Sequence, residues 1–234
     1  MKIALAQINP VVGDIERNTK KIISIIRKIN ADVVIFPELS ITGYSPQDLL
    51  LKHSFIDRNM DALKTIVQNT RQKSAIVGFV ERAYENLYNS AAVIRNQQIV
   101  EIHHKICLPN YTIFDEKRWF KEGKEPKIFS LKEKIFGLSI CEDIWFPETT
   151  KMQRDDGAEL IINISASPYR KGKIEDIENV LKQRWEENKV PIIYVNQVGS
   201  QDGIVYYGHS IYFKDGKVAK KCKDFEEDTL IVEV

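Results

Sequence analysis

Cysteine is scarce in this 234-residue sequence, and its distribution excludes a disulfide framework. The three cysteines, Cys107, Cys141 and Cys222, are odd in number and widely spaced, and no CxxC pair is present. Disulfide-stapled folds and structural zinc sites both need paired or closely spaced cysteines. The pattern therefore predicts free thiols in a reducing compartment, and we expect a cytoplasmic protein.

An excess of charge of either sign is also missing. The 34 Lys and Arg residues are balanced by 33 Asp and Glu residues, so bulk charge gives no field that attracts nucleic acid or an anionic membrane. No apolar run approaches the roughly 20 residues of a membrane span. No basic and apolar leader precedes the first apolar stretch at residues 2–6. We expect no nucleic-acid partner, no membrane association and no secretory signal.

The hydrophobic pattern predicts one α/β domain over residues 1–234, because a chain of this length and 43% hydrophobic content can bury one large core. Buried strands are predicted at residues 2–8, 31–36, 74–80, 135–140, 159–164, 191–196 and 230–234. Helices are predicted after the N-cap Asp14 and at residues 55–72, 145–156 and 174–188. Two β-hairpins are predicted, 87–95 with 98–105 and 207–213 with 217–222, so the sheets are mixed.

Three chemically active side chains follow predicted strands: Glu38, Lys105 and Cys141. The carboxyl ends of strands are the usual place for chemistry in α/β proteins. A carboxylate can take the proton of a thiol, an ammonium can stabilise an oxyanion, and a thiolate is a strong nucleophile. The acidic pair after Cys141 suits the first turn of a helix, which would lower the pKa of the thiol.

Each of these residues also has a structural interpretation. Glu38 can cap a turn, Lys105 can be a charge on the rim, and Cys141 can be a small buried hydrophobe. A metal site is not indicated, because the adjacent His103 and His104 would point to opposite faces of a strand.

The sequence around these residues resembles the nitrilase superfamily of carbon–nitrogen hydrolases. The matching segments are 36–44 (FPELSITGY), 104–111 (HKICLPNY) and 139–145 (SICEDIW), in that order. The resemblance implies an α-β-β-α sandwich with mixed β-sheets that commonly packs against a second subunit, so we expect a homo-oligomer. It also implies Glu38 as general base, Lys105 as oxyanion stabiliser and Cys141 as nucleophile.

Further segments resemble the glutaminase domain of glutamine-dependent NAD synthetases. They are residues 46–50 (PQDLL), 110–111 with 114–120 (FDEKRWF), and 165–173 (SASPYRKGK). The resemblance implies that Ser167 and Lys173 hold the α-carboxylate of glutamine and that Glu142 faces its α-amino group. It places Tyr44 and Tyr111 along the pocket, with Glu116 as a supporting carboxylate near Lys105. Ser167 can instead simply turn the chain, and Lys173 can lie on a solvated helix.

The function expected from this resemblance is release of ammonia from glutamine through a cysteine thioester, without a metal or organic cofactor. No SGGxDS-type pyrophosphate loop is present in these residues, so we expect either a free-standing glutaminase subunit that supplies ammonia to a separate ammonia-dependent NAD synthetase or a glutaminase domain cut out of a longer enzyme. Two alternatives are open. One is a stand-alone amidase acting on another ω-amide or on an N-carbamoyl compound, and the other is a non-catalytic protein that kept the fold.

Overall fold

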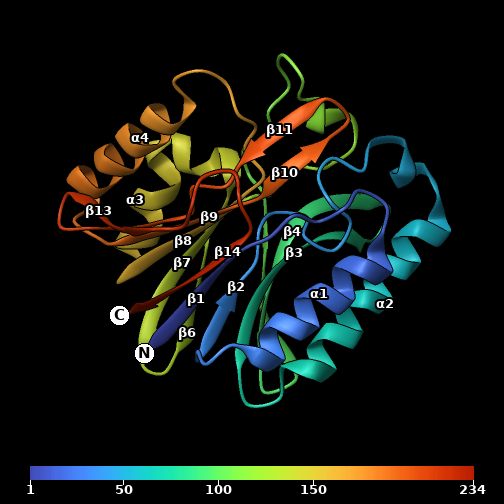
Figure 1. Ribbon diagram of the computed structural model, residues 1–234, viewed down its shortest axis with the longest axis horizontal. Helices are drawn as coiled ribbons and strands as arrows, with labels where there is room; N and C mark the ends of the chain where they lie inside the picture. The colour runs from blue at the N-terminus through green and yellow to red at the C-terminus, as the bar shows by residue number, and fades with distance from the viewer.

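Two six-stranded β-sheets lie face to face between two pairs of helices, as Figure 1 shows. The computed structural model describes residues 1–234. Helices α1 (Ile15–Lys28) and α2 (His53–Thr70) cover the first sheet, and α3 (Pro147–Asp155) and α4 (Lys173–Asn188) cover the second. The expected α-β-β-α sandwich is confirmed.

The first sheet has the strand order β14-β1-β2-β3-β4-β5. Its strands are β1 (Lys2–Gln7), β2 (Val33–Ile35), β3 (Ser74–Ala83), β4 (Asn86–Arg95), β5 (Gln98–His104) and β14 (Asp228–Glu233). The β1–β2 and β2–β3 pairs are parallel, and the remaining pairs are antiparallel. The sheet is therefore mixed, as expected, with its parallel part at β1 to β3.

The second sheet has the order β13-β12-β9-β8-β7-β6, and β7, β8 and β9 run parallel. Its strands are β6 (Lys127–Leu131), β7 (Lys134–Ile140), β8 (Leu160–Ser165), β9 (Ile192–Asn196), β12 (Ile211–Lys214) and β13 (Lys217–Lys221). A separate two-stranded hairpin contains β10 (Val198–Gln201) and β11 (Ile204–Tyr207). Short 3₁₀ helices η1 (Gln47–Leu51), η2 (Glu116–Arg118) and η3 (Cys141–Trp145) lie in the connections.

The two-residue period of a strand explains how one apolar run serves two cores. In β1, Ile3 and Leu5 face the core between the sheets, while Ala4 and Ala6 face the helical layer. The small alanines let α1 approach the sheet, and Ile22 is one of the helix residues packed there. Strands that are buried on both faces therefore carry continuous apolar sequences.

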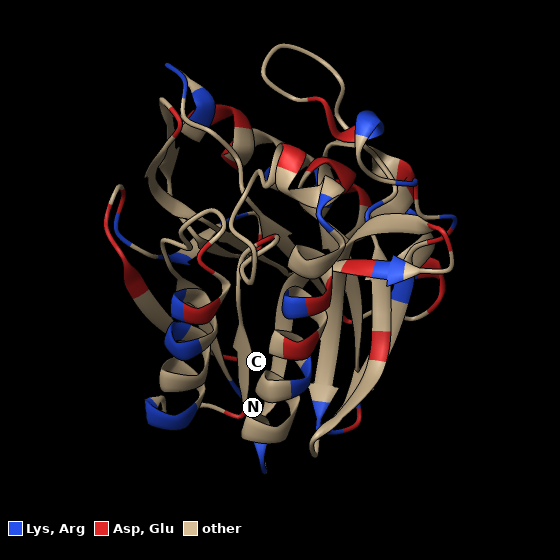
Figure 2. Ribbon diagram, turned by 90° about the vertical axis from the view of Figure 1, so that its right-hand side faces the viewer, with Lys and Arg blue, Asp and Glu red and all other residues tan.

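Residues of both charge signs are interspersed along the ribbon, including the helices on this side of the molecule, as Figure 2 shows. This distribution agrees with the balanced composition and leaves no broad face of one sign in that view. None of the helices combines the length and the apolar character that crossing a bilayer demands.

The structure differs from the sequence prediction at three places: one predicted strand is split, and two elements were not predicted. The predicted strand 207–213 is split, because Gly208 and His209 adopt positive φ angles of 69° and 58° between β11 and β12. The β10–β11 hairpin was not predicted, although Asp202-Gly203 at its turn is a strong hairpin signal. Strand β6 was also missed, because its turn to β7 uses Lys132-Glu133 at positive φ rather than the usual glycine.

A glycine on β3 fixes the position of the chain that follows β2. A Cβ at Gly78 would lie 2.4 Å from the backbone nitrogen of Leu39 and 2.6 Å from the carbonyl oxygen of Pro37. Only a residue without a side chain permits such a close approach of two backbones. The segment that carries Glu38 is thereby laid directly on the sheet.

Candidate active site

The three predicted strand-end residues meet at the carboxyl ends of their strands. Glu38 follows β2, Lys105 follows β5, and Cys141 is the first residue of η3 after β7. The Lys105 Nζ donates to Oε1 of Glu38 and to Oε1 of Glu116, each at 2.7 Å. All three charged side chains are buried, so one ammonium group joins two carboxylates away from water.

The Glu38 carboxylate is held by further donors from distant parts of the chain. The Asn89 side-chain amide donates to its Oε1 at 2.7 Å, and the backbone N–H of Ala166 donates to its Oε2 at 2.8 Å. Hydrogen bonds from donors on separate segments fix the orientation of a carboxylate. The Glu38 carboxylate is thus held in a defined position. Asn89 was not predicted, and its signal is a pair of polar residues, Asn89 and Ser90, in the buried part of β4.

The charges in this cluster determine its protonation. Burial lowers the pKa of Lys105, but the negative charges of Glu116 and Glu38 outweigh burial and raise that pKa well above its usual value. Burial, with the charge of Glu38, raises the pKa of Glu116 to about 7, against the opposing effect of Lys105. Lys105 is therefore a permanent cation at neutral pH, and Glu116 titrates in the neutral range.

The pKa of the Cys141 thiol is raised, whereas the sequence predicted that it would be lowered. The helix that was expected to lower its pKa is only the short η3 turn, and the side chain is buried at 7% exposure. Burial raises the pKa of Cys141 well above its usual value, the charge of Glu38 raises it further, and Lys105 opposes both. The resting thiol is therefore protonated, and forming a thiolate requires a base.

Cys141 lies in the wall of a cavity of about 420 Å³. Tyr111, Glu142, Ser167 and Lys173, all predicted as substrate-binding residues, line the same cavity. The Tyr111 hydroxyl donates to the Glu142 carboxylate at 2.8 Å. The cavity therefore combines the thiol with an acidic group, a serine and a lysine.

Lys173 belongs to this cavity rather than to solvent. Its Nζ lies 4.1 Å from the ring centroid of Trp145, which is a favourable cation–π arrangement. Burial lowers the pKa of Lys173, while the neighbouring Cys141 and Glu142 counteract this effect. Trp145 and Arg170 also line this cavity and were not predicted, because no spacing in the sequence assigns them to it.

Tyr44 is not among the residues that line the Cys141 cavity, in contrast to the expectation. It lines a neighbouring cavity of about 230 Å³ together with Glu116, and its hydroxyl donates to Oε1 of Glu116 at 2.6 Å. The ring of Tyr44 also lies 5.9 Å from the Lys105 Nζ. Tyr44 therefore contacts the Lys105–Glu116 pair from the neighbouring cavity, not from the Cys141 cavity.

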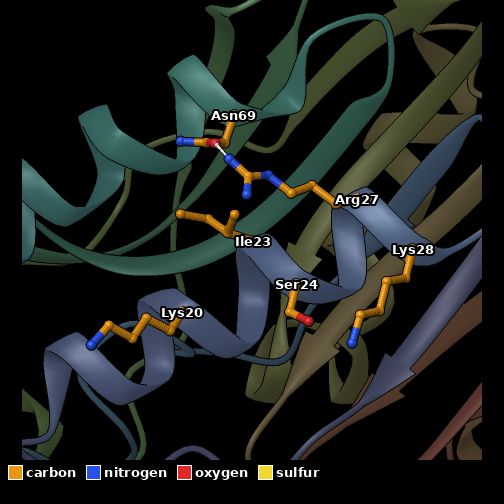
Figure 3. A pocket seen from close by; sticks show the side chains of 6 residues that line it. All are labelled: Lys20, Ile23, Ser24, Arg27, Lys28 and Asn69. Atoms are coloured by element: carbon orange, nitrogen blue, oxygen red, sulfur yellow. Dashed lines mark hydrogen bonds between the residues drawn. The ribbon is translucent and has the colours of Figure 1, made fainter.

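The two adjacent histidines and a hollow outside the Cys141 cavity do not form further candidate sites. His103 and His104 contact different carboxylates, Asp143 at 3.1 Å and Glu81 at 2.6 Å, which confirms that they face opposite directions. A hollow of about 410 Å³ lies between α1 and α2. It is lined by Lys20, Ile23, Ser24, Arg27, Lys28 and Asn69, whose side chains are drawn in Figure 3. Arg27 reaches Asn69, whereas the lysines extend in different directions. The cations do not converge, so this hollow is a poor anion site.

The raised thiol pKa predicts the pH dependence of chemical modification. Without substrate, alkylation of Cys141 by iodoacetamide should be slow at neutral pH and should keep rising above about pH 9, since only the thiolate reacts. Peptide-resolved mass spectrometry measures the rate, and Cys107, whose pKa burial raises to about 12, is the internal reference. A plateau between about pH 6 and 8 would contradict a protonated resting thiol.

The chain is similar to known proteins over almost its whole length. The chain is 42% identical over 237 residues to the glutamine-dependent NAD(+) synthetase of Aquifex aeolicus, covering 99% of this chain and 42% of that protein. It is 38% identical over 242 residues to the Thermotoga maritima protein of the same name, covering 100% and 42%. The chain thus spans less than half the length of the curated relatives it matches.

The chain is also similar to solved structures. Glutamine-dependent NAD+ synthetase from Acinetobacter baumannii superposes with a TM-score of 0.94 at 36% identity, over 98% of this chain and 44% of that one. An amidase from Nesterenkonia shares the fold, with a TM-score of 0.89 at 22% identity over 100% of this chain and 90% of that one. The sequence model of carbon-nitrogen hydrolases matches residues 2–234. The chain therefore belongs to the carbon–nitrogen hydrolase family.

Proposed function

We propose that this chain hydrolyses the side-chain amide of glutamine through a thioester on Cys141 and supplies the ammonia to an NAD synthetase. One observation carries the proposal. The Cys141 thiol, backed by the buried Glu38–Lys105 pair, opens into a cavity whose walls carry Glu142 and Lys173. A carboxylate and an ammonium are the groups that an α-amino acid needs for its charged ends.

The reaction begins with transfer of the thiol proton from Cys141 to Glu38. The sulfur attacks the amide carbon, and the oxyanion is stabilised by Lys105 and the backbone N–H of Glu142. Glu38 then gives its proton to the departing nitrogen, and ammonia leaves a γ-glutamyl thioester. Glu38 next takes a proton from water, which attacks the thioester carbon. The carbon–sulfur bond then breaks, glutamate leaves, and Glu38 returns the proton to the Cys141 sulfur.

Each remaining residue has a distinct role in this proposal. Glu116 keeps Lys105 charged and oriented, so the ammonium acts as a donor and does not compete as a base. Lys173, with Ser167, would bind the α-carboxylate, and Trp145 orients the lysine. Glu142, fixed by the hydroxyl of Tyr111, would bind the α-amino group. No step of this scheme requires a metal or an organic cofactor.

Domain organisation and partners follow as parts of the same proposal. Residues 1–234 act as one glutaminase unit, and the ammonia acceptor is a synthetase activity of the kind named in the longer relatives. The relatives' names support glutamine as the ammonia source for this chain. The homo-oligomer stays a prediction.

Replacement of the nucleophile tests the proposed activity. Cys141→Ala should reduce ammonia release from glutamine by at least roughly 1,000-fold, because no other group can form the thioester. Glutamine binding by calorimetry should be nearly unchanged, since little volume is removed. Cys222→Ala, at a buried cysteine outside the cavity, is the matched control and should keep wild-type activity. Residual turnover above about a tenth of wild type would contradict the nucleophile assignment.

Lys173 tests the choice of glutamine as substrate. Lys173→Met should raise the KM for glutamine by roughly 10–100-fold, the loss expected for one charge-assisted contact. Hydrolysis of a small amide without an α-carboxylate should hardly change, because its transition state never contacts this lysine. Ammonia release is the measured quantity for both substrates.

The matched control for this experiment is Lys171→Met, at an exposed lysine that does not line the cavity. It should leave both activities unchanged. Equal loss on both substrates in Lys173→Met, or no loss on either, would remove the reason for naming glutamine. Faster turnover of the small amide than of glutamine by the wild-type chain would favour a stand-alone amidase.

A further inference from the structure

A completely buried carboxylate joins the lysine segment to the nucleophile turn. Asp143 has 0% exposure and lies in η3, two residues after Cys141. Its Oδ1 accepts the backbone N–H groups of Ile106 at 3.0 Å and Cys107 at 2.8 Å, directly after Lys105. The contact therefore connects the carboxyl end of β5 to the turn that follows β7.

The second carboxylate oxygen of Asp143 contacts the end of β7 and a histidine of β5. Its Oδ2 accepts the backbone N–H of Ile140 at 2.9 Å, and Nε2 of the buried His103 lies 3.1 Å away. Because a carboxylate only accepts, Nε2 of His103 carries the proton in this contact. Four donors thus converge on two oxygens, which is what a buried charge needs to be retained.

The backbone of Cys141 makes this contact necessary. Cys141 has a φ of 46°, a left-handed conformation that a residue with a Cβ disfavours. Such a conformation persists only where the surroundings fix it. Asp143 fixes the residue before Cys141, and the Asn163 amide lies 3.5 Å from the carbonyl oxygen of Cys141 itself.

We propose that Asp143 is a positioning residue that sets the place of the Cys141 sulfur relative to the Lys105 ammonium, with His103 as its buried hydrogen-bond partner. The catalytic part of this proposal rests on the proposed function. The positioning of the Cys141 sulfur by Asp143 does not depend on that function. Asp143 neither lines the cavity nor contacts the reacting atoms. It acts through the backbone before and after Cys141 and through the backbone directly after Lys105.

The test exchanges one atom group at Asp143. In Asp143→Asn, one side-chain oxygen becomes an NH₂ group, which must then face at least one of the donors. We expect kcat to fall roughly 100-fold, as for a misplaced reacting group. The KM for glutamine should stay within about threefold, because the cavity residues are unchanged. The same loss of kcat should appear with a small amide that lacks the α-amino and α-carboxylate groups.

Asn59→Asp is the matched control, because it makes the reverse exchange at a fully buried side chain that bonds only the backbone of Val80. Both variants are compared at a temperature where thermal unfolding shows each to be folded. The control should keep wild-type kcat per folded molecule. An equal loss of kcat in both variants, or a wild-type kcat in Asp143→Asn, would overturn the proposal.

Thiol reactivity provides a readout that needs no substrate. Freeing the turn should expose Cys141, so its alkylation by iodoacetamide at pH 9 should become at least about fivefold faster in Asp143→Asn, while Asn59→Asp matches wild type. If the wild-type chain fails to hydrolyse glutamine but this contrast appears, the proposed function fails and the positioning role stands. Unchanged alkylation in Asp143→Asn would overturn the positioning role alone.

Discussion

The buried ammonium of Lys105 is the constraint on which the rest of the site depends. An ion without a partner in a protein interior costs several kcal/mol, and breaking such a pair costs about 3–5 kcal/mol. Lys105 meets this demand with two carboxylates at 2.7 Å, which come from the segment after β2 and from η2. The pairing therefore fixes three chain segments around one point, and Tyr44 extends the arrangement by bonding Glu116.

Burial explains why the Cys141 thiol rests in its neutral form. Burial and the charge of Glu38 raise the pKa of Cys141, whereas Lys105, which also pairs with two carboxylates, opposes them. In the proposed mechanism, transfer of the thiol proton to Glu38 moves one negative charge from the carboxylate to the sulfur, so the net charge of the cluster is unchanged. Proton transfer within a buried cluster then needs no solvent reorganisation around a new charge.

The sequence predicted what depends on local pattern and missed what depends on distant hydrogen bonds. Strand periodicity correctly located Glu38, Lys105 and Cys141 at strand ends, and the structure brings these ends together from both sheets, β2 and β5 from the first and β7 from the second. It could not locate Asp143 or Asn89, because their partners lie far away in sequence and follow no period. The direction of the Tyr44 side chain was misjudged for the same reason. The short η3 turn was mistaken for a helix start, since acidic residues favour both.

The central claim is that Glu38 removes the proton of Cys141 before a thioester forms on that sulfur. Single-turnover reaction with glutamine, quenched in acid and mapped by peptide mass, measures this step directly. The account predicts a γ-glutamyl group on Cys141 in the wild-type chain and its absence in Glu38→Gln, which keeps the shape of the side chain but cannot accept the proton. An adduct forming at the wild-type rate in Glu38→Gln, or on a residue other than Cys141, would contradict it.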